Sequence, residues 1–357
     1  MRIAKVVAVV ISISLVFAWI EWVQTHVPLP AAPGQATVSA PTRPLSLDLT
    51  ARTPTAAARL AVAPDQPVAT PPPVPAAAPT LGAAPPPAAA AASTCSGNPN
   101  ALGVSRVVEI DTTGGPGFGW EHFKIHDFLR DREVVLTFDD GPWPGNTPAV
   151  LKALADHCTK AIFFPIGKHA TYYPEILKQV LAAGHTVGSH TWAHKDLSRK
   201  PYDNNLDLAK EEIEKGVSAV RLALGAPAAP FFRFPSLKHP PELVTYLGQR
   251  NVGIFSTDMD SFDFTMRTPD KVIKSVIAKL QKHGKGIVLM HDFQHATAEA
   301  LPELLNQLKA NGYKLVHMKA KEPIKTIAQY DEMVAKEIKL PTVSDRPTSS
   351  VVRTISD

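Results

Sequence analysis

Side chains that could do acid–base or metal chemistry recur at equivalent places in this 357-residue sequence, directly after short apolar runs. They are Asp139, Asp140, His190, His194, Arg233, Asp258, Asp260, Asp263, His291 and Asp292. If the apolar runs are parallel strands of a barrel, their C-terminal ends and the loops that follow them form one face. We therefore expect five separate segments to deliver acids, imidazoles and an arginine to a single rim.

Two adjacent carboxylates, Asp139 and Asp140, follow the first of these runs and precede a Gly-Pro turn. Neighbouring side chains that leave a strand point in different directions, so one could bind a metal while the other stays free as a base. An ordinary turn with capping aspartates would use the same residues.

The histidine pair His190 and His194 makes the metal interpretation stronger. Histidines four positions apart can meet on one face of a helical turn and supply two imidazoles to one metal. Surface or core histidines also occur at this spacing. Two histidines with one carboxylate leave coordination positions open and suit Zn, Fe, Co or Ni.

The elements that must position these residues alternate between strand and helix patterns. Strands are expected at 133–138, 161–164, 186–189, 231–234, 252–256, 287–290 and 314–317, and helices at 146–157, 174–183, 203–224, 240–250, 269–283 and 297–310. About seven consecutive strand–helix units predict an α/β fold with a parallel sheet covered by helices. We expect the sheet to close into a barrel, with an open doubly wound sheet as the alternative.

Residues 1–27 are typical of an export signal. Arg2 and Lys5 precede an apolar run at 6–20 that is short for a membrane-spanning helix and suits the core of a signal sequence. Because no small-residue cleavage site follows, we expect an uncleaved signal anchor in the inner membrane, with the rest of the chain in the periplasm or another extracytoplasmic space. Secretion after signal cleavage is the alternative.

The rest of the chain divides by composition. Residues 28–94 are rich in proline and alanine, which predicts a disordered linker. Residues 95–322 hold the strand and helix patterns of the expected folded domain, and residues 323–357 form a C-terminal extension. Cys95 and Cys158 could pair in an oxidising compartment or remain free thiols. A formal net charge of +4 without a basic stripe argues against a nucleic-acid partner, and no protein partner is inferred.

Several short motifs occur in a fixed order along the expected domain. They are TFDDGP at 137–142, AIFFPIG at 161–167, GHTVG at 184–188, HTWAH at 190–194, RFPS at 233–236, DSFDF at 260–264 and LMH at 289–291. In type and order they resemble the motifs of the polysaccharide deacetylases that share the NodB homology domain, carbohydrate esterase family 4. The resemblance covers residues 133–318 and implies a distorted (β/α)7 barrel related to the TIM barrel.

The resemblance also assigns the metal site and the base. It implies that Asp140, His190 and His194 hold one divalent metal ion, with Zn expected and Co, Ni or Fe as alternatives. It implies that Asp139 is the general base and that Arg233 holds this base in place.

The same resemblance assigns the remaining roles. It makes His291 the general acid and Asp260 the carboxylate that orients His291. The backbone N–H of Ser236 is the expected oxyanion donor, and Phe264 with Leu289 is expected to form an apolar pocket for the acetyl group. The family commonly has an aromatic residue where Ser236 stands and a tryptophan where Phe264 stands, so we expect the sugar cleft to differ.

The motifs and the export signal together predict an enzyme that acts on a polysaccharide outside the cytoplasm. The expected reaction is metal-dependent removal of N-acetyl groups from N-acetylglucosamine-type units of peptidoglycan, exopolysaccharide or chito-oligosaccharide. An O-acetyl esterase of acetylated glycans is one alternative. A non-catalytic glycan-binding module is another, although it would be expected to lack the base or a metal ligand, and neither is missing from the motifs.

Overall fold

The computed structural model describes residue 95 and residues 97–338. The anchor expected at 1–27, the linker expected at 28–94 and residues 339–357 lie outside the described residues, and what was expected of them stays a prediction. Within the described part, no helix combines the length and the apolar character needed to cross a membrane.

Strands and helices alternate along the described chain, as the sequence pattern predicts. The strands are β1 (Arg106–Ile110), β2 (Gly117–Phe118), β3 (Glu133–Asp139), β4 (Ile162–Phe164), β5 (Thr186–Val187), β6 (Phe231–Phe232), β7 (Gly253–Phe255), β8 (Met259–Asp260), β9 (Gly286–His291) and β10 (Lys314–Ala320). The helices are α2 (Asn146–Asp156), α3 (Gly167–Tyr172), α4 (Pro174–Ala182), α5 (Leu206–Leu224), α6 (Pro241–Gln249), α7 (Pro269–His283), α8 (His295–Ala310) and α9 (Ala328–Ile338), with 3-10 turns η1 (Tyr202–Asn204), η2 (Pro235–Leu237) and η3 (Asp263–Thr265). Each predicted strand and helix has a counterpart, and β1, β2, β8, α3 and α9 are additional.

Strand β3 lies at the centre of the sheet, and its sequence EVVLTFD is buried throughout. Such a continuous, mostly apolar run is typical of a parallel strand that is covered on both faces. One side of β3 pairs with β9, while the other side pairs with β10 at its start and with β4 at its end. Because these ladders are all parallel, the carboxyl ends of β3, β4 and β9 lie together.

The strands from β3 to β9 follow one another nearly in sequence order. β3, β4 and β5 are neighbours, a single bridge between Ser189 and Phe232 leads from the end of β5 to β6, and β6 pairs with β7. Beyond the other side of β3, β9 pairs with β8. The predicted parallel α/β sheet is therefore confirmed. No ladder joins β7 to β8 among the described strands, so the barrel-like arrangement has interrupted hydrogen bonding.

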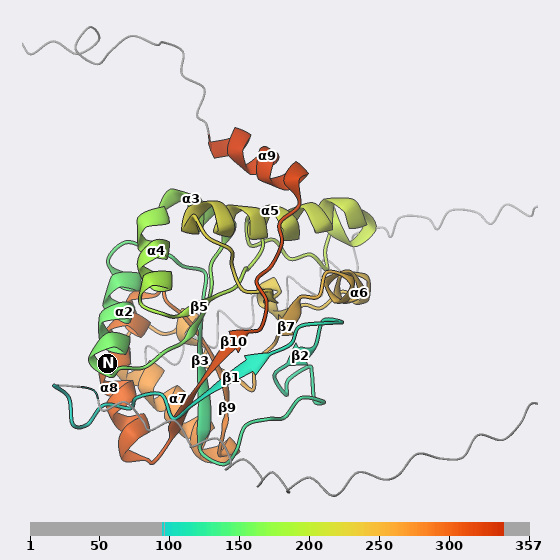
Figure 1. Ribbon diagram of the computed structural model, residues 1–357. Coiled ribbons are helices and arrows are strands. Elements are labelled where there is room, and N and C mark those ends of the chain that lie inside the picture. The colour runs from blue at the N-terminus through green and yellow to red at the C-terminus, as the bar shows by residue number, and fades with distance from the viewer. Residues whose placement is uncertain (1–94, 96, 339–357) are drawn as a thin grey trace, which may run out of the picture. The chain divides into compact units, whose positions relative to one another are not determined.

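Helices cover the sheet (Figure 1), with α2, α4 and α8 along one side and α3 and α5 across another. In α7, Val272, Val276 and Leu280 are four residues apart and buried, which places one apolar stripe against the core. Burial of each such side chain contributes about 1.5–3 kcal/mol to the stability of the fold. This packing holds the strand ends from which the polar residues project.

Both ends of the described chain are tied to the core. A disulfide joins Cys95 to Cys158, with Cα atoms 5.7 Å apart, so the pairing alternative is the one observed. At the other end α9 lies against α5, where Arg221 pairs with Asp331 at 3.0 Å. The folded part thus continues past residue 322 into the segment expected as a C-terminal extension.

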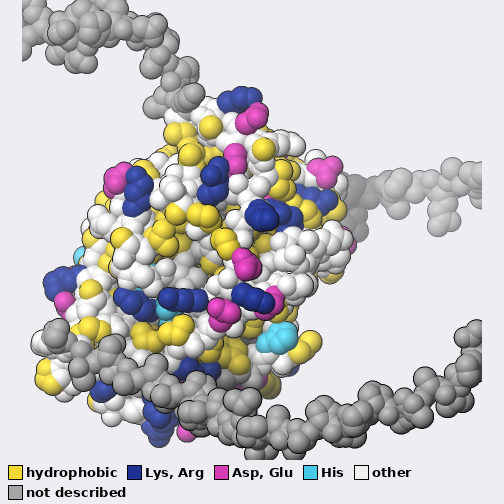
Figure 2. All heavy atoms as spheres, in the orientation of Figure 1, with side chains coloured by type: hydrophobic (Ala, Val, Ile, Leu, Met, Phe, Trp, Pro, Cys, Tyr) yellow, Lys and Arg dark blue, Asp and Glu magenta, His cyan; other side chains and the backbone are white. Residues whose placement is uncertain are grey.

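The face of the domain over β1 and β10 carries mixed charges (Figure 2). Lysine and arginine side chains lie beside acidic ones, with apolar side chains between them. One exposed pair, Lys321 with Asp111 at 3.1 Å, joins the ends of these two strands. Exposed ion pairs contribute only about 0–1 kcal/mol each, so the stability of the domain depends mainly on its apolar core.

Candidate active site

The two adjacent aspartates lie where β3 ends. Asp139 is the last residue of the strand and is buried, while Asp140 turns the chain with a φ of 73°. Gly141 lies so close to the carboxylate of Asp292 that a Cβ would collide with it. That carboxylate accepts hydrogen bonds from the Gly141 N–H (3.1 Å) and the Thr147 hydroxyl (2.5 Å), and burial raises the pKa of Asp292 to about 7. Asp292 therefore holds the turn that carries Asp140.

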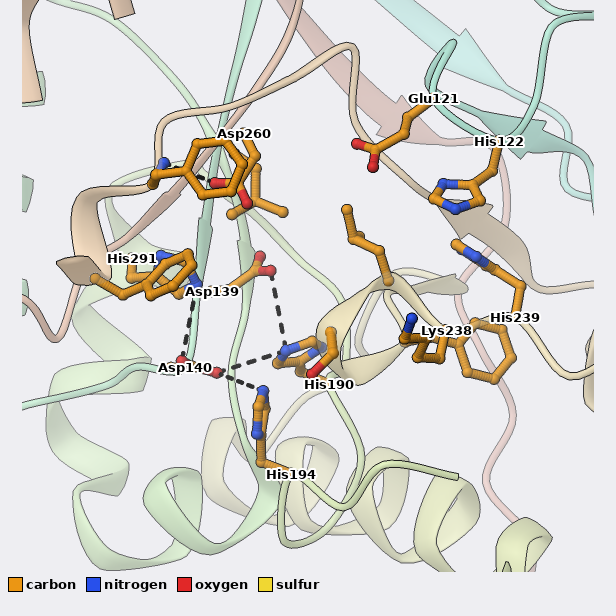
Figure 3. A pocket seen from close by; sticks show the side chains of 16 residues that line it. Glu121, His122, Asp139, Asp140, His190, His194, Lys238, His239, Asp260 and His291 are labelled. Carbon is orange, nitrogen blue, oxygen red and sulfur yellow. Dashed lines mark hydrogen bonds and ion pairs between the residues drawn. The ribbon is translucent and has the colours of Figure 1, made fainter. Parts of the chain in front are cut away.

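The three predicted metal ligands converge in front of this turn (Figure 3). The Nε2 atoms of His190 and His194 lie 3.5 and 3.4 Å from Oδ1 of Asp140. This oxygen is buried and has no hydrogen-bond partner among the described residues. A buried carboxylate oxygen without a partner is costly, and a cation among these three side chains would satisfy it. The residues therefore fit a divalent metal with open coordination positions.

Residues that pack against the loop carrying His190 and His194 orient these rings for metal binding. Nδ1 of His190 lies 2.7 Å from the carbonyl oxygen of Arg233, which places the ring proton on Nδ1 and leaves Nε2 free for a metal. Burial lowers the pKa of His190 well below its ordinary value, so the ring is neutral, as a metal ligand must be. The predicted helical turn is wrong, because Thr191 and His194 have φ values of 65° and 54°. A Cβ on Gly216 of α5 would stand 2.5 Å from the backbone of Thr191, so α5 presses directly on this loop.

The expected base and the arginine that holds it are in contact. Fully buried Arg233 donates hydrogen bonds from Nη1 to Oδ1 of Asp139 and to the hydroxyl of Thr137, both at 2.7 Å. Its Nη2 donates to the carbonyl of Ser256 at 2.8 Å. Burial raises the pKa of Asp139 to about 6, although the nearby Arg233 charge acts in the opposite direction. One oxygen of the Asp139 carboxylate is thus held in place by Arg233, while the other faces the predicted metal ligands.

The imidazole of His291 is oriented by Asp263, and the prediction that Asp260 does this is wrong. The ring Nδ1 lies 2.6 Å from Oδ1 of Asp263, while the backbone N–H of His291 and the hydroxyl of Thr297 donate to Oδ2 at 2.8 and 2.5 Å. Asp260 instead accepts from the backbone N–H of Phe262 at 2.8 Å. Burial opposes protonation of His291, but the hydrogen bond and charge of Asp263 raise its pKa to about 9.

One pocket of about 690 Å³ contains the predicted site, and every residue to which the resemblance assigns a role, except Arg233, lines it. Asp258, Asp263 and Asp292, which were also expected at this rim, do not line it. Leu289 is buried in its wall, where an apolar acetyl group could pack. The ring of Phe264 is half exposed and lies 5.5 Å from that of His291, edge to face. Ser236 lies in the wall within η2 at a φ of 53°.

Four polar residues of the pocket were not expected from the sequence: Glu121, His122, Lys238 and His239 line its other side (Figure 3). The rings of His122 and His239 lie 4.4 Å apart, and Nδ1 of His122 is 2.7 Å from the Ser256 hydroxyl. Burial lowers the pKa of His239 to about 4. Glu121 and His122 precede the first predicted strand in a segment without periodicity, so nothing in the sequence marked them. Lys238 and His239 follow the arginine motif after one intervening residue, Leu237, and this proximity was the available signal.

The groups around this pocket define a class of chemistry. A buried carboxylate, an imidazole held by a second carboxylate and an Asp/His ligand set are what metal-assisted hydrolysis requires.

Comparison with known proteins leads to one family. A family model described as polysaccharide deacetylase matches residues 128–252. A peptidoglycan-N-acetylglucosamine deacetylase of Listeria monocytogenes is 34% identical over 189 residues, which cover 52% of this chain and 38% of the relative. A chitooligosaccharide deacetylase of Sinorhizobium fredii is 30% identical over 193 residues, which cover 50% of this chain and 87% of the relative. A solved peptidoglycan deacetylase of Bdellovibrio bacteriovorus has a TM-score of 0.55 at 33% identity, covering 61% of this chain and 59% of that one.

The chain belongs to the polysaccharide deacetylase family, as the motif resemblance implies. It spans less than two thirds of the Listeria relative and of the Bdellovibrio chain.

Proposed function

We propose that this chain is a metal-dependent deacetylase that removes N-acetyl groups from an extracytoplasmic glycan of N-acetylglucosamine-type units. The observation that carries the proposal is the pocket in which Oδ1 of Asp140, without a hydrogen-bond partner in the part of the chain that the structure describes, faces two imidazoles, with Asp139 and His291 beside it. Relatives named for peptidoglycan-N-acetylglucosamine and chitooligosaccharide deacetylation support this substrate class.

Asp140, His190 and His194 would hold the metal ion, with Zn expected and Co, Ni or Fe as alternatives. Such an ion, when bound, polarises a carbonyl group and lowers the pKa of a bound water.

The protein's own groups supply the proton transfers. Asp139 takes a proton from the water that attacks the acetyl carbonyl, and its pKa of about 6 leaves it ionised and basic near neutral pH. His291 carries a proton at neutral pH and gives it to the departing amine, while Asp263 holds its other ring nitrogen. The products are acetate and a free amino group on the sugar. The backbone N–H of Ser236 is the proposed oxyanion donor, a contact worth about 3–4 kcal/mol in other enzymes.

We also propose that the domain works outside the cytoplasm, held by an N-terminal anchor. The disulfide between Cys95 and Cys158 supports this, because disulfides persist in oxidising compartments. The basic and apolar character of residues 1–27 supports it as well. Protease added to spheroplasts should digest the domain while sparing a cytoplasmic marker. Protection of the domain in intact spheroplasts would refute export.

The test of the activity is acetate release from an N-acetylglucosamine oligomer and from acetylated xylan, by protein stripped with a chelator and reloaded with single metals. We expect release from the N-acetyl substrate that disappears with the chelator and returns with a metal. Release from the xylan alone would favour an O-acetyl esterase, and no release from either by metal-loaded protein would refute the proposal.

A matched pair of histidine variants tests the metal site in the same assay. His194→Gln should lose both bound metal and acetate release. His295→Gln should keep both, because His295 is an exposed residue paired with Glu299 at 3.1 Å and belongs neither to the ligand set nor to the pocket lining. Full metal content in His194→Gln would contradict the proposed ligand set.

A further inference from the structure

Trp192 lies between the two histidines of the predicted metal site, and it is buried. Its backbone N–H donates to the carbonyl of Glu212 in α5 at 2.8 Å, and its own carbonyl accepts from the N–H of Lys168 in α3 at 2.9 Å. Thr191 and His194, on either side of it, have left-handed backbone conformations, which residues other than glycine keep only where their surroundings impose them. The separation of the two ligand rings therefore depends on what holds Trp192.

The indole ring of Trp192 is enclosed by α3 and α5. Nζ of Lys215 lies 5.1 Å from the ring centroid and Nζ of Lys168 lies 5.8 Å from it, distances at which an aromatic face attracts a cation. A Cβ on Gly167 would stand 2.9 Å from the ring, so the start of α3 also packs closely against it.

The nearer of these two cations, Lys215, depends on a partner from another helix. Its side chain is only 8% exposed, and a buried ammonium group needs an opposite charge. Glu211 lies 3.6 Å away, one turn earlier on α5. Glu337 of α9 accepts a hydrogen bond from Lys215. The place of this ammonium group over the indole ring is therefore set partly by α9.

The apolar side of α9 is directed to the same region. Val334 of α9 is completely buried and belongs to a small apolar cluster with Trp192 and Ala219. α9 packs on α5 (Figure 1) and lies beyond residue 318, where the motif resemblance ends. A helix outside the motifs thus supports the loop that carries two of the predicted metal ligands.

We propose that α9 is a clamp on the histidine loop, residues 190–194. Glu337 fixes Lys215 over the indole ring, Val334 packs in the cluster that holds this ring, and the two ligand imidazoles are thereby kept where both can bind one metal ion. None of the three residues lines the pocket, so they are positioning residues. The inference rests on the proposed metal-dependent function and deepens it, because it names the part of the chain that sets the affinity for the metal.

The test is the dissociation constant for Zn, measured by titrating metal-free full-length protein against a chelator of known affinity. The clamp variants are Val334→Ala/Glu337→Ala, which changes only α9, and Lys215→Ala, which removes the cation over the ring. Loss of a residue that orients a metal ligand weakens metal binding by about ten- to hundredfold. We expect the lower end of this range, about tenfold, for each clamp variant, because these residues act on the ligands through Trp192.

Asp331→Ala is the matched control on α9. Asp331 pairs with Arg221 of α5 at 3.0 Å, so this change also removes a contact between the two helices. Neither residue belongs to the Trp192 cluster or to the cations over its ring, and the variant should keep the wild-type affinity for Zn. Urea unfolding of each metal-free variant separates a loss of affinity from a loss of stability.

Co, one of the expected metals, adds a spectroscopic readout, because its visible absorption reports the geometry of the ligands that hold it. At saturating Co the spectrum should change in both clamp variants and stay that of the wild type in Asp331→Ala. Unchanged affinity and spectrum in both clamp variants would overturn the clamp. An equal loss of affinity in Asp331→Ala would overturn it as well, because the effect would then not pass through Lys215 and Trp192.

Two other outcomes concern the proposed function itself. A wild type that binds no metal would overturn the metal-dependent function and the clamp with it. Metal binding that weakens in the clamp variants, without acetate release by the loaded wild type, would overturn the deacetylase activity and leave the clamp in place.

Discussion

The hydrogen bond between His291 and Asp263 leads to a quantitative prediction for the variant Asp263→Asn. Asp263 supplies the largest contributions that raise the pKa of His291, to about 9. Without that charge the pKa should fall toward the ordinary value of 6.5, a difference worth about 3.4 kcal/mol at 1.36 kcal/mol per pKa unit. At pH 8 the protonated fraction of His291 would then drop from about 0.9 to about 0.03, which is about thirtyfold less general acid.

The assay is kcat/KM for acetate release as a function of pH, with protein loaded with one metal. The general acid must be protonated, so the wild type should keep its activity until the pH approaches 9 and then lose it. In Asp263→Asn the loss should begin near pH 6.5, while activity at lower pH changes less. The variant Asp260→Asn is the matched control, because its carboxylate hydrogen-bonds to Phe262 rather than to His291.

Two results would refute this reasoning. One is an alkaline limb that stays in place in Asp263→Asn. The other is a limb that moves equally in Asp260→Asn. Since Asp263 also accepts from Thr297, thermal unfolding of both variants should be followed to show that the remaining protein is folded.

Three other predictions concern the base, the disulfide and the buried histidines. Asp139→Asn should retain bound metal and lose acetate release by at least about a hundredfold, and near-wild-type turnover would remove Asp139 as the base. Replacing Cys95 and Cys158 by serine opens a covalent loop with a sequence separation of 63 and should lower the free energy of unfolding by about 4 kcal/mol in urea titrations, whereas an unchanged midpoint would show that the bridge is absent in solution. Burial lowers the pKa of His185 to about 3 and of His317 to about 4, so both stay neutral in the fold while the unfolded chain takes up protons below pH 6.5. The free energy of unfolding of the metal-free protein should therefore be highest above pH 6.5 and fall toward pH 4 by about 1.4 kcal/mol per pH unit for each histidine. The variant His185→Gln should show a shallower fall. An equal slope in the variant and the wild type would contradict the conclusion that His185 stays neutral in the fold.

The three residues that converge as a possible metal site could be named from the sequence because each lies in a short local motif. Asp139 and Asp140 end a strand whose apolar run is unmistakable, and His190 and His194 share one loop. The strand order then follows from consecutive parallel units, whose carboxyl ends must meet. The prediction of a helical turn at the two histidines was wrong, because residues 191 and 194 have left-handed backbone conformations and the two rings meet through this loop instead.

The partner of His291 could not be predicted in the same way. Asp260 and Asp263 belong to one loop, and composition does not say which carboxylate turns inward. The choice is made by the backbone at Phe262, whose φ of 57° starts η3 and buries Asp263. The resemblance named the motif correctly and assigned the wrong member of it.

By itself, then, the sequence determined the parallel α/β class, because strand periodicity is a short-range property of the chain, and its short motifs carried the family resemblance that implies a base and a set of metal ligands. Only the tertiary structure decided which distant groups complete the site. Asp263 meets His291 across 28 positions, and Cys95 meets Cys158 across 63. Glu121 joins the pocket from a segment that precedes the first predicted strand. Such contacts depend on how the packing of helices and loops brings remote parts of the backbone together. No local pattern of residues encodes the distance between such remote parts.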